Sequence, residues 1–360
     1  MVRSKVAVIK TSPASVLADI KKLMHLADYQ QFLPRGPEIA LKINISWHHY
    51  YPACSTTPWQ LEGVIKTLLE DGYPRESIYA CHNRTVVVSA RKGEKRNKQL
   101  PVVEKYGLRN IHLYEGEEWI KYEPKGKIRV LQTIFPQGVE IPKRFLGSNI
   151  IHLPTMKTHV FTTMTGAMKN AFGGLLQERR HWTHSVIHET LVDLLQIQKE
   201  IHAGVFAVMD GTIAGDGPGP RCLVPSVKNY LLASADQVAI DAIAAKMMGF
   251  EPMDLKFIRL AHEAGLGCGD PREVEVVGED ISEVNFHFQK AANTLASRGQ
   301  KLIYWGPLKP LEKILLRSFI TPLSYLASVI FHDWLWHPLI GRRRTKKILW
   351  TEWGELFRCY

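Results

Sequence analysis

The chain has 360 residues, 45% of them hydrophobic and 22% charged, and its formal net charge is +11 at pH 7. These proportions are ordinary for a globular protein and argue against intrinsic disorder, and the length predicts one large α/β domain with an appendage. Ten Lys/Arg against four Asp/Glu in residues 301–360 give +6 there, which leaves +5 for residues 1–300. This distribution argues against a nucleic-acid groove in the main domain, so nucleic acid is not an expected partner.

The main domain is expected to span residues 1–300, where short apolar runs alternate with segments of helical spacing. The predicted strands are 5–9, 38–46, 77–81, 111–114, 149–153, 204–209, 229–233 and 274–277. The predicted helices are 15–32, 58–70, 185–201, 235–248 and 255–264. This alternation predicts an α/β fold with a mainly parallel, twisted sheet flanked by helices. The basic stretch 84–100 is interpreted as a flexible excursion, and residues 117–135 as a hairpin.

Residues 153–188 stand out by composition. They contain two lysines, two arginines, four histidines and a Gly-Gly pair, with no Asp and a single Glu. Lys, Arg and backbone N–H groups are hydrogen-bond donors, so such a segment is typical of an anion-binding surface. It begins at the carboxyl end of the predicted strand 149–153, where ligands usually bind in open α/β sheets. The expected ligand is a small anion such as a carboxylate or a phosphate.

Lys157, His159, Lys169 and Asp210 are the candidate catalytic residues. A lysine beside another cation in a desolvated crevice has a lowered pKa and can act as a base or nucleophile. Lys157 or His159 would transfer a proton, while a second lysine holds the anion. Asp210 ends a predicted strand and would organise the site directly or through a divalent ion. A solvated loop and helix face is the alternative interpretation of the lysines.

The candidate ligand-binding residues lie at predicted strand ends or near glycine-rich turns. They are Lys42, Asn44, Thr57, Asn170, Gly173, Gly174, Gly215, Gly217 and His181. The glycines would let a ligand approach the backbone closely, or would simply supply tight turns. The glycine-rich segment after Asp210 matches neither G-x-x-x-x-G-K-[ST] nor G-x-G-x-x-G, the two phosphate-binding motifs.

No cofactor is identified from the sequence, although a divalent metal is considered. His184 and His188 are four residues apart and would share one face of a helix, and with Asp241 they are the metal candidates. Ordinary polar contacts of the imidazoles, and an ion pair between Asp241 and a lysine, are the alternatives.

Residues 301–360 are predicted to form a basic, Trp-rich helical segment outside the main domain. Residues 320–340 contain no Lys or Arg, but two prolines and Asp333 interrupt the apolar run. A spanning helix needs about 20 apolar residues in succession, so these interruptions disfavour one. Tryptophans beside a basic cluster suit an interfacial anchor, and residues 306–347 are expected to meet an anionic membrane surface. Packing on the domain or on a second copy of the chain is the alternative.

Five separated motifs together resemble a known family. They are Lys42-x-Asn44 with Thr57-Pro58, Leu153-Pro154-x-x-Lys157-x-His159, Thr165-Gly166-x-x-Lys169-Asn170-x-x-Gly173, Asp210-Gly211 followed by Gly215-x-Gly217-Pro218, and Ala235-Asp236-x-x-Ala239-x-Asp241. In this order and spacing, residues 38–280 resemble the domain-of-unknown-function 362 family. Many relatives carry ferredoxin-type cysteine motifs, which implies iron–sulfur chemistry in them. The five cysteines here include no C-x-x-C pair, so no intrinsic ferredoxin-type cluster is expected.

Two functions follow from these observations. The first is an enzyme that binds a small anionic metabolite in a crevice lined by Lys, Asn and Gly. The second is a membrane-associated accessory protein, for example in redox or cofactor assembly, that binds a ligand without catalysis. The N-terminus has no apolar core of signal-peptide length, so a cytoplasmic location is expected, peripheral on the inner face of a membrane in the second case.

Overall fold

The computed structural model describes residues 4–290, 292–319 and 321–360, so Ile320 of the apolar run lies outside the described residues. The strands are β1 (Lys5–Lys10), β2 (Ile39–Ile43), β3 (Ile78–His82), β4 (Arg109–His112), β5 (Trp119–Tyr122), β6 (Val139–Pro142), β7 (Asn149–Leu153), β8 (Thr155–His159), β9 (Thr163–Met164), β10 (Gly204–Asp216), β11 (Val224–Ser234) and β12 (Glu275–Gly278). The α-helices of the main domain are α1 (Val16–Leu26), α2 (Tyr29–Phe32), α3 (Pro58–Glu70), α4 (Ala90–Arg96), α5 (Gln99–Lys105), α6 (Leu131–Ile134), α7 (Gly166–Asn170), α8 (Phe172–Leu175), α9 (Ile187–Ile201), α10 (Gln237–Met248) and α11 (Lys256–Glu263).

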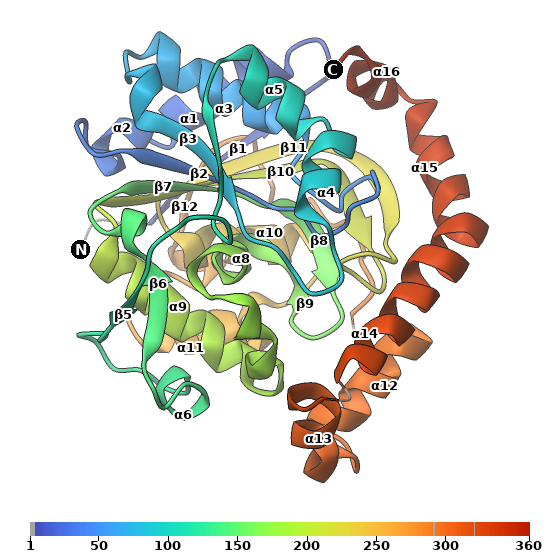
Figure 1. Cartoon of the computed structure of the whole chain (residues 1–360). Coiled ribbons are helices and arrows are strands. Elements are labelled where there is room, and N and C mark those ends of the chain that lie inside the picture. The colour runs from blue at the N-terminus through green and yellow to red at the C-terminus, as the bar shows by residue number, and fades with distance from the viewer. Residues whose placement is uncertain (1–3, 291, 320) are drawn as a thin grey trace.

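One sheet runs through the molecule in the order β12-β1-β11-β10-β7-β2-β3-β4, and β8 and β9 extend it beside β10 (Figure 1). Strands β10, β7, β2, β3 and β4 are parallel to one another, whereas β11 runs antiparallel to both β10 and β1. The predicted α/β fold with a mainly parallel sheet is therefore confirmed. Because parallel strands end at one edge of a sheet, the segments that follow β2, β3 and β7 meet there.

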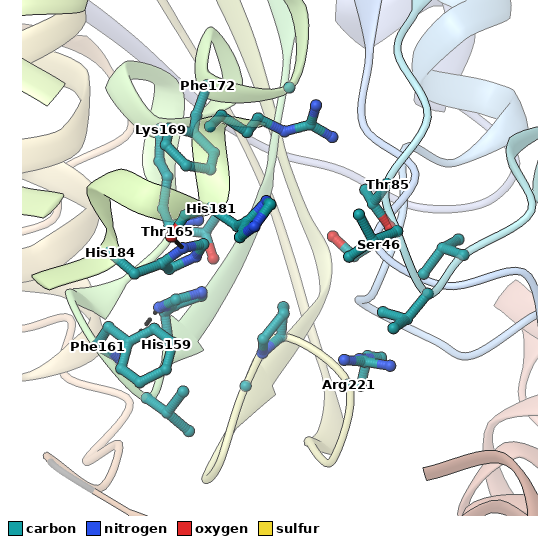
Figure 2. A pocket seen from close by; sticks show the side chains of 18 of the residues that line it. Ser46, Thr85, His159, Phe161, Thr165, Lys169, Phe172, His181, His184 and Arg221 are labelled. Carbon is teal, nitrogen blue, oxygen red and sulfur yellow. Dashed lines mark hydrogen bonds between the residues drawn. The ribbon is translucent and has the colours of Figure 1, made fainter. Parts of the chain in front are cut away.

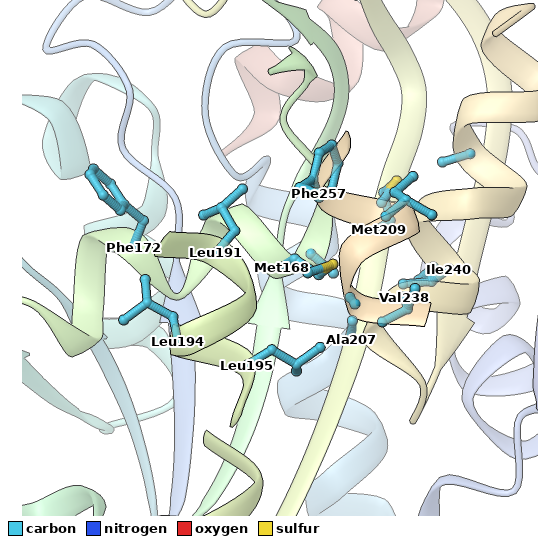
Figure 3. Close-up of a cluster of buried hydrophobic side chains, with 14 of the residues drawn as sticks. Met168, Phe172, Leu191, Leu194, Leu195, Ala207, Met209, Val238, Ile240 and Phe257 are labelled. Atoms are coloured by element: carbon cyan, nitrogen blue, oxygen red, sulfur yellow. The ribbon is translucent and has the colours of Figure 1, made fainter. Parts of the chain in front are cut away.

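Helices cover both faces of the sheet and form two apolar cores. One core contains Ile20 of α1, Trp59 of α3 and Val102 of α5. The other contains Leu191 of α9 and residues of α7, α10 and α11, with Met168, Ile240 and Phe257 among them (Figure 3). The sheet is thus buried on both faces, as parallel sheets usually are.

Several predicted boundaries are confirmed by local hydrogen bonds. Thr57 caps α3 by accepting from the backbone N–H of Gln60 at 3.3 Å, and Pro58 is the first helical residue. Asp236 caps α10 by accepting from the N–H of Val238 at 2.8 Å. These caps satisfy backbone donors that the first helical turn leaves free.

Other local predictions are wrong. Residues 84–100 are not a flexible excursion, because they contain α4 and the start of α5. Ser89 caps α4, and Glu94 is 3% exposed while the lysines and arginines of α4 face solvent. The predicted hairpin in 117–135 also fails, since β5 pairs with β6 outside that range. The predicted helix 15–32 is interrupted at Asp28, whose φ of 50° ends the helical path.

The C-terminal arm, residues 295–360, is helical as predicted. It consists of α12 (Leu295–Tyr304), α13 (Glu312–Arg317), α14 (Thr321–Val329), a π-helix (Ile330–Gly341), α15 (Arg342–Leu349) and α16 (Glu352–Cys359). The arm runs along one side of the sheet domain (Figure 1). Trp353 anchors its end, being 2% exposed and donating from Nε1 to Asn229 Oδ1 at 2.7 Å.

No single helix of the described chain has the length and apolar composition to cross a membrane. Taken together, Lys309–Arg317 and Thr321–Leu349 do meet that test, with a bend of 85° between them.

Candidate functional site

A cavity of about 290 Å³ opens where the strands end, and we call it the basic pocket (Figure 2). Its wall comes from the ends of β2, β3 and β8, from α7 and α8, from the 3-10 helix Glu178–Val186, and from the C-terminal arm. The sequence-predicted residues in this wall are Lys42, Asn44, His159, Lys169, Asn170, Gly173, His181 and His184. A cavity of this size suits a small ligand.

The charges of the wall have one sign. Lys42, Lys169, Arg180 and Arg221 supply four cationic groups, and no Asp or Glu occurs among the described residues that line the cavity. Lys42 and Lys169 also make no ion pair with a carboxylate anywhere in the described chain. The charges of these two lysines, in a partly desolvated cavity, attract an anion far more strongly than they would in water.

Lys42 is the most deeply buried of these cations. It is 3% exposed, and its Nζ donates to the backbone oxygen of Ile43 at 2.5 Å. Burial lowers its pKa to about 8, and the charge of Arg180 acts in the same direction. Gly174 makes room for its stem, since a Cβ there would lie 2.7 Å from Lys42 Cε. Gly174 therefore supports Lys42, and it does not line the pocket.

Lys169 extends from α7 into the pocket (Figure 2). Its Nζ lies 5.2 Å from the centroid of the Phe172 ring, an arrangement that allows a cation–π contact. Burial, together with the charges of Lys157 and Arg180, lowers its pKa to about 7. A group with this pKa is present in both protonation states at neutral pH, as general acid–base catalysis requires.

Lys157 is fully buried and does not line the cavity. Its Nζ donates to Asn44 Oδ1 at 3.1 Å, Ser46 Oγ at 3.3 Å and Thr155 Oγ1 at 3.0 Å, and also to the backbone oxygen of Cys54. Four acceptors surround three N–H bonds, so the ammonium is already saturated. Because Asn44 and Ser46 do line the pocket, Lys157 is placed to position them rather than to touch a ligand.

The neutral imidazoles of His159 and His184 lie near each other on the same wall of the pocket (Figure 2). His159 Nδ1 accepts from the backbone N–H of Phe161 at 3.2 Å, which assigns the ring proton to Nε2. Burial and the charge of Lys169 keep the pKa of His159 well below its ordinary value. His184 has the opposite tautomer, since its Nδ1 donates to the backbone oxygen of His181 at 2.8 Å, and burial lowers its pKa to about 3.

Two amides join the strand ends to the helices beside the pocket. Asn170 Nδ2 donates to the backbone oxygen of Lys42 at 2.9 Å, and Asn44 Nδ2 donates to Asn170 Oδ1 at 3.5 Å. Gly173 lies against the same lysine, with an added Cβ 3.8 Å from Lys42 Nζ. Lys42, Asn44 and Asn170 are thus held as one unit.

The structure places Asp210 and Thr57 outside the pocket wall. Asp210 Oδ1 accepts from the N–H of Thr212 at 2.7 Å, and Oδ2 accepts from Trp59 Nε1 at 3.0 Å and from the Thr57 hydroxyl. Burial raises the pKa of Asp210, although these donors oppose that effect. The carboxyl group links β10 to the start of α3, so we assign it no part in organising the pocket.

Gly215 and Gly217 also lie away from the pocket wall, because β10 continues through the segment predicted as a loop. A Cβ at Gly215 would lie 2.7 Å from Leu223 Cδ1, so this glycine permits close packing. Gly217 has a φ of 85°, which glycine adopts without strain, and it supplies the turn between β10 and β11.

The three metal candidates do not come together. His184 lies in a 3-10 helix and His188 in α9, so the spacing of four does not put them on one α-helical face. Asp241 accepts from the backbone N–H groups of Ala167 at 2.5 Å and Met168 at 3.0 Å, and makes no lysine pair among the described residues. Burial raises the pKa of Asp241 to about 8. Within the described chain, none of the three belongs to a group of side chains with metal-ligand spacing.

Sequence reasoning missed His82, Arg221 and the contribution of the C-terminal arm. His82 directly follows the predicted strand 77–81, and Arg221 is the last residue of the glycine-rich segment 212–221, so both positions carried a signal. No sequence pattern indicated that the C-terminal arm contributes to the pocket. In the structure Tyr325 of the arm lines the pocket, and its hydroxyl lies 3.0 Å from His181 Nε2. That contact joins residues 144 positions apart.

Comparisons with known proteins agree with the resemblance seen in the motifs. A family model described as "Domain of unknown function (DUF362)" matches residues 39–246. A "Thylakoid-associated protein" from Synechocystis sp. is 22% identical over 284 residues, which are 75% of this chain and 84% of the relative. The region matched by the family model contains Lys42, Lys157 and Lys169 but not the C-terminal arm.

Proposed function

The chain belongs to the DUF362 family, and we propose that it binds a small anionic metabolite in the basic pocket and acts on it by proton transfer. The observation that carries the proposal is a cavity lined by four cationic side chains and by no carboxylate of the described residues. Its volume of about 290 Å³ suits a small ligand such as a carboxylate or phosphate compound.

The proposed roles follow from the protonation states. Lys42 and Arg221 hold the anionic group, and His159 donates a hydrogen bond from Nε2. Lys169 exchanges a proton with the ligand, because its pKa of about 7 makes both forms available at neutral pH. His184 is too weak a base for that role, since its pKa is about 3. Lys157 positions Asn44 and Ser46.

The test is calorimetry and thermal denaturation of the full chain with sulfate, inorganic phosphate and malonate. Ligand binding raises the melting temperature in proportion to RT ln(1 + [L]/Kd). Lys169→Met should weaken binding about 10- to 100-fold, because a hydrogen bond to a charged group contributes ~1.5–3 kcal/mol. Lys66→Met is the control, since this lysine is 49% exposed on α3. Equal stabilisation of both variants by all three anions would refute the proposal.

Association with an anionic membrane surface is a second candidate function, favoured by the outer face of the C-terminal arm. Phe319 is 92% exposed, Trp334 66% and Leu339 65%. On α15, Arg342, Arg343, Lys346 and Lys347 are exposed, whereas Arg344 turns inward and donates to the backbone oxygen of Leu223 at 2.7 Å. An apolar stripe beside clustered basic residues is typical of interfacial helices, and the Synechocystis relative is described as thylakoid-associated.

Vesicle flotation tests this second function. The wild-type chain should float with vesicles that contain phosphatidylglycerol and not with phosphatidylcholine alone. Trp334→Glu with Leu339→Glu should abolish flotation, and exchanging the four exposed basic residues of α15 for Gln should reduce it in a salt-dependent way. Point variants are preferable to truncation, because Trp353 and Phe357 of the arm are buried in the domain. Unchanged flotation of the double variant would refute the proposal.

A further inference from the structure

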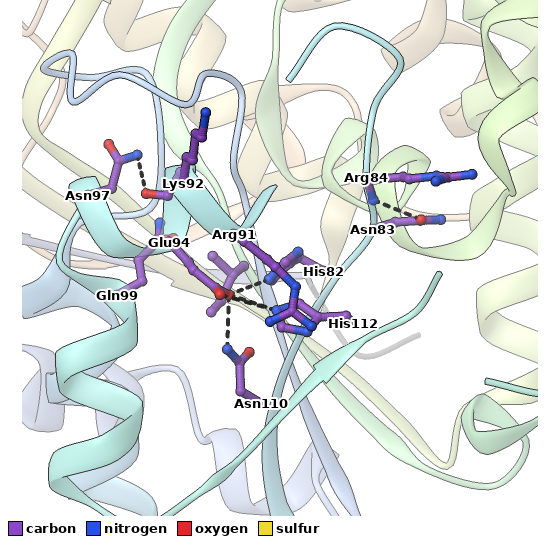
Figure 4. Close-up of polar contacts among 12 residues, drawn as sticks. His82, Asn83, Arg84, Arg91, Lys92, Glu94, Asn97, Gln99, Asn110 and His112 are labelled. Atoms are coloured by element: carbon purple, nitrogen blue, oxygen red, sulfur yellow. Dashed lines mark hydrogen bonds and ion pairs between the residues drawn. The ribbon is translucent and has the colours of Figure 1, made fainter. Parts of the chain in front are cut away.

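A buried cluster of two histidines and one glutamate lies beside the basic pocket (Figure 4). His82 Nε2 is 2.8 Å from Glu94 Oε2, and His112 Nε2 is 3.0 Å from the same oxygen. One ligand atom from each residue lies within 4.8 Å of the others. His82 also lines the pocket, so the cluster and the pocket share a wall.

The fold brings the three side chains together from separate elements. His82 and His112 are register partners at the ends of the parallel strands β3 and β4, so their side chains leave the sheet on the same face. Glu94 reaches them from α4. A Cβ at Gly93 would lie 2.5 Å from Ile45 Cγ2, so glycine at this position lets α4 pack closely against the segment that follows β2.

Hydrogen bonding within the cluster leaves its donors and acceptors poorly matched. The Glu94 carboxylate lies within hydrogen-bond distance of both imidazole Nε2 atoms and accepts a hydrogen bond from Asn110 Nδ2 at 2.9 Å. If both Nε2 atoms carry the protons, both Nδ1 atoms are bare lone pairs. His112 Nδ1 would then face a second carboxylate, Glu115 Oε2, at 3.7 Å. His82 Nδ1 is buried and has no hydrogen-bond partner in the described chain.

A bound cation removes the mismatch at His112. When a metal takes the Nε2 lone pair, the ring proton moves to Nδ1, and an Nδ1–H then points toward the Glu115 carboxylate. Metal-binding histidines usually donate their second ring N–H to a carboxylate or carbonyl in this way. Arg91 in turn holds Glu115 through a hydrogen bond from Nε at 3.3 Å.

We propose that His82, Glu94 and His112 bind one divalent transition-metal ion at the side of the basic pocket. Two imidazoles and one carboxylate are the donor set of catalytic zinc sites and of mononuclear non-haem iron(II) sites, and both kinds leave coordination positions open. The metal site differs from the three candidates predicted from the sequence, and it does not depend on anion binding in the pocket.

The experiment uses the full chain, freed of metal by chelator dialysis and kept free of added anionic ligands. Zn²⁺, Co²⁺ and, without oxygen, Fe²⁺ are titrated in turn; elemental analysis gives the stoichiometry and cobalt absorption bands report the ligand geometry. One metal ion per chain should bind, with release of protons in weakly buffered solution. The comparison of Zn²⁺ with Fe²⁺ identifies the metal class.

Variants locate the binding site. Glu94→Gln and His112→Ala should each weaken binding by more than about 100-fold, since even changes outside the direct ligands weaken metal sites ~10- to 100-fold. His262→Ala is the matched control, because His262, Cys268 and Glu273 form another close group of donors. Should a variant misfold, ¹⁵N spectra of histidine-labelled wild-type protein must show two imidazoles shifting with Zn²⁺.

Absence of stoichiometric binding by the wild-type chain, or retained binding in Glu94→Gln and His112→Ala, would overturn the metal proposal. Loss of binding in His262→Ala alone would move the metal to the other group and overturn it as well. A failure of phosphate, sulfate and malonate to bind bears only on the basic pocket, so the two proposals fail separately.

Discussion

Replacing Lys42 by methionine should stabilise the ligand-free protein while removing its response to anions. Methionine is unbranched and apolar, so it can follow the path of the lysine stem past Gly174. The pKa of Lys42 falls from 10.5 to about 8 on folding. A pKa difference of one corresponds to ~1.4 kcal/mol, so keeping this ammonium charged in the fold at pH 7 costs ~3 kcal/mol.

Part of that gain is offset in the variant. The hydrogen bond from Lys42 Nζ to the backbone oxygen of Ile43 is lost, and a hydrogen bond contributes ~1 kcal/mol net. The expected increase in the free energy of unfolding is therefore ~2 kcal/mol at pH 7, measured by urea denaturation without added anion.

The pH dependence provides an independent check with a definite sign. The folded-state pKa lies below the unfolded value, so the unfolded chain binds the extra proton between about pH 8 and 10.5 and stability rises with pH there. Wild-type protein should gain ~2 kcal/mol from Lys42 between pH 7 and about pH 9.5, and Lys42→Met should lack that gain. Lys66→Met, on the exposed face of α3, should leave both quantities within ~0.5 kcal/mol. A Lys42→Met protein that is less stable than wild type at pH 7, with an unchanged pH slope, would refute the reasoning.

Three further predictions use the same protein. The affinity for sulfate, measured by calorimetry, should fall as pH rises through about 7, because Lys169 loses its proton there; in Lys169→Met the decrease near pH 7 should disappear and leave the one near pH 8 that comes from Lys42, and a decrease that persists unchanged near pH 7 would contradict the assignment. Gly174→Ala should lower the free energy of unfolding by ~1–3 kcal/mol, since the new Cβ would overlap the Lys42 stem. The control is Gly299→Ala in α12, which should not destabilise the protein, because no described atom lies within 4 Å of its Cβ position. Trp353→Ala should cost ~3–5 kcal/mol and expose the C-terminal arm to limited proteolysis, whereas Trp350→Ala, at a side chain 77% exposed, should do neither.

The amino-acid sequence carries enough local information to predict most elements of the sheet domain. The run 149–153 coincides with β7, and Thr57-Pro58 marks the start of α3, because apolar periodicity and helix caps are properties of neighbouring residues. The same kind of information fails for α4. Its charged outer face resembles a solvated loop in the sequence, and the burial of Glu94 depends on a strand pair that lies elsewhere in the chain.

The fold class could be inferred from the order of residues alone, as could the donor-rich, acid-poor character of residues 153–188 and the basic, apolar composition of the last sixty residues. Which of the donors share a cavity depends on how the chain packs. The packing brought Arg221 and Tyr325 to Lys169 and His181, turned Lys157 inward to hold Asn44, and paired Asp210 with Thr57 and Trp59. The physical reason is that a side chain's type fixes what it can bind, whereas its neighbours depend on strand order, register and helix packing over separations of more than a hundred residues.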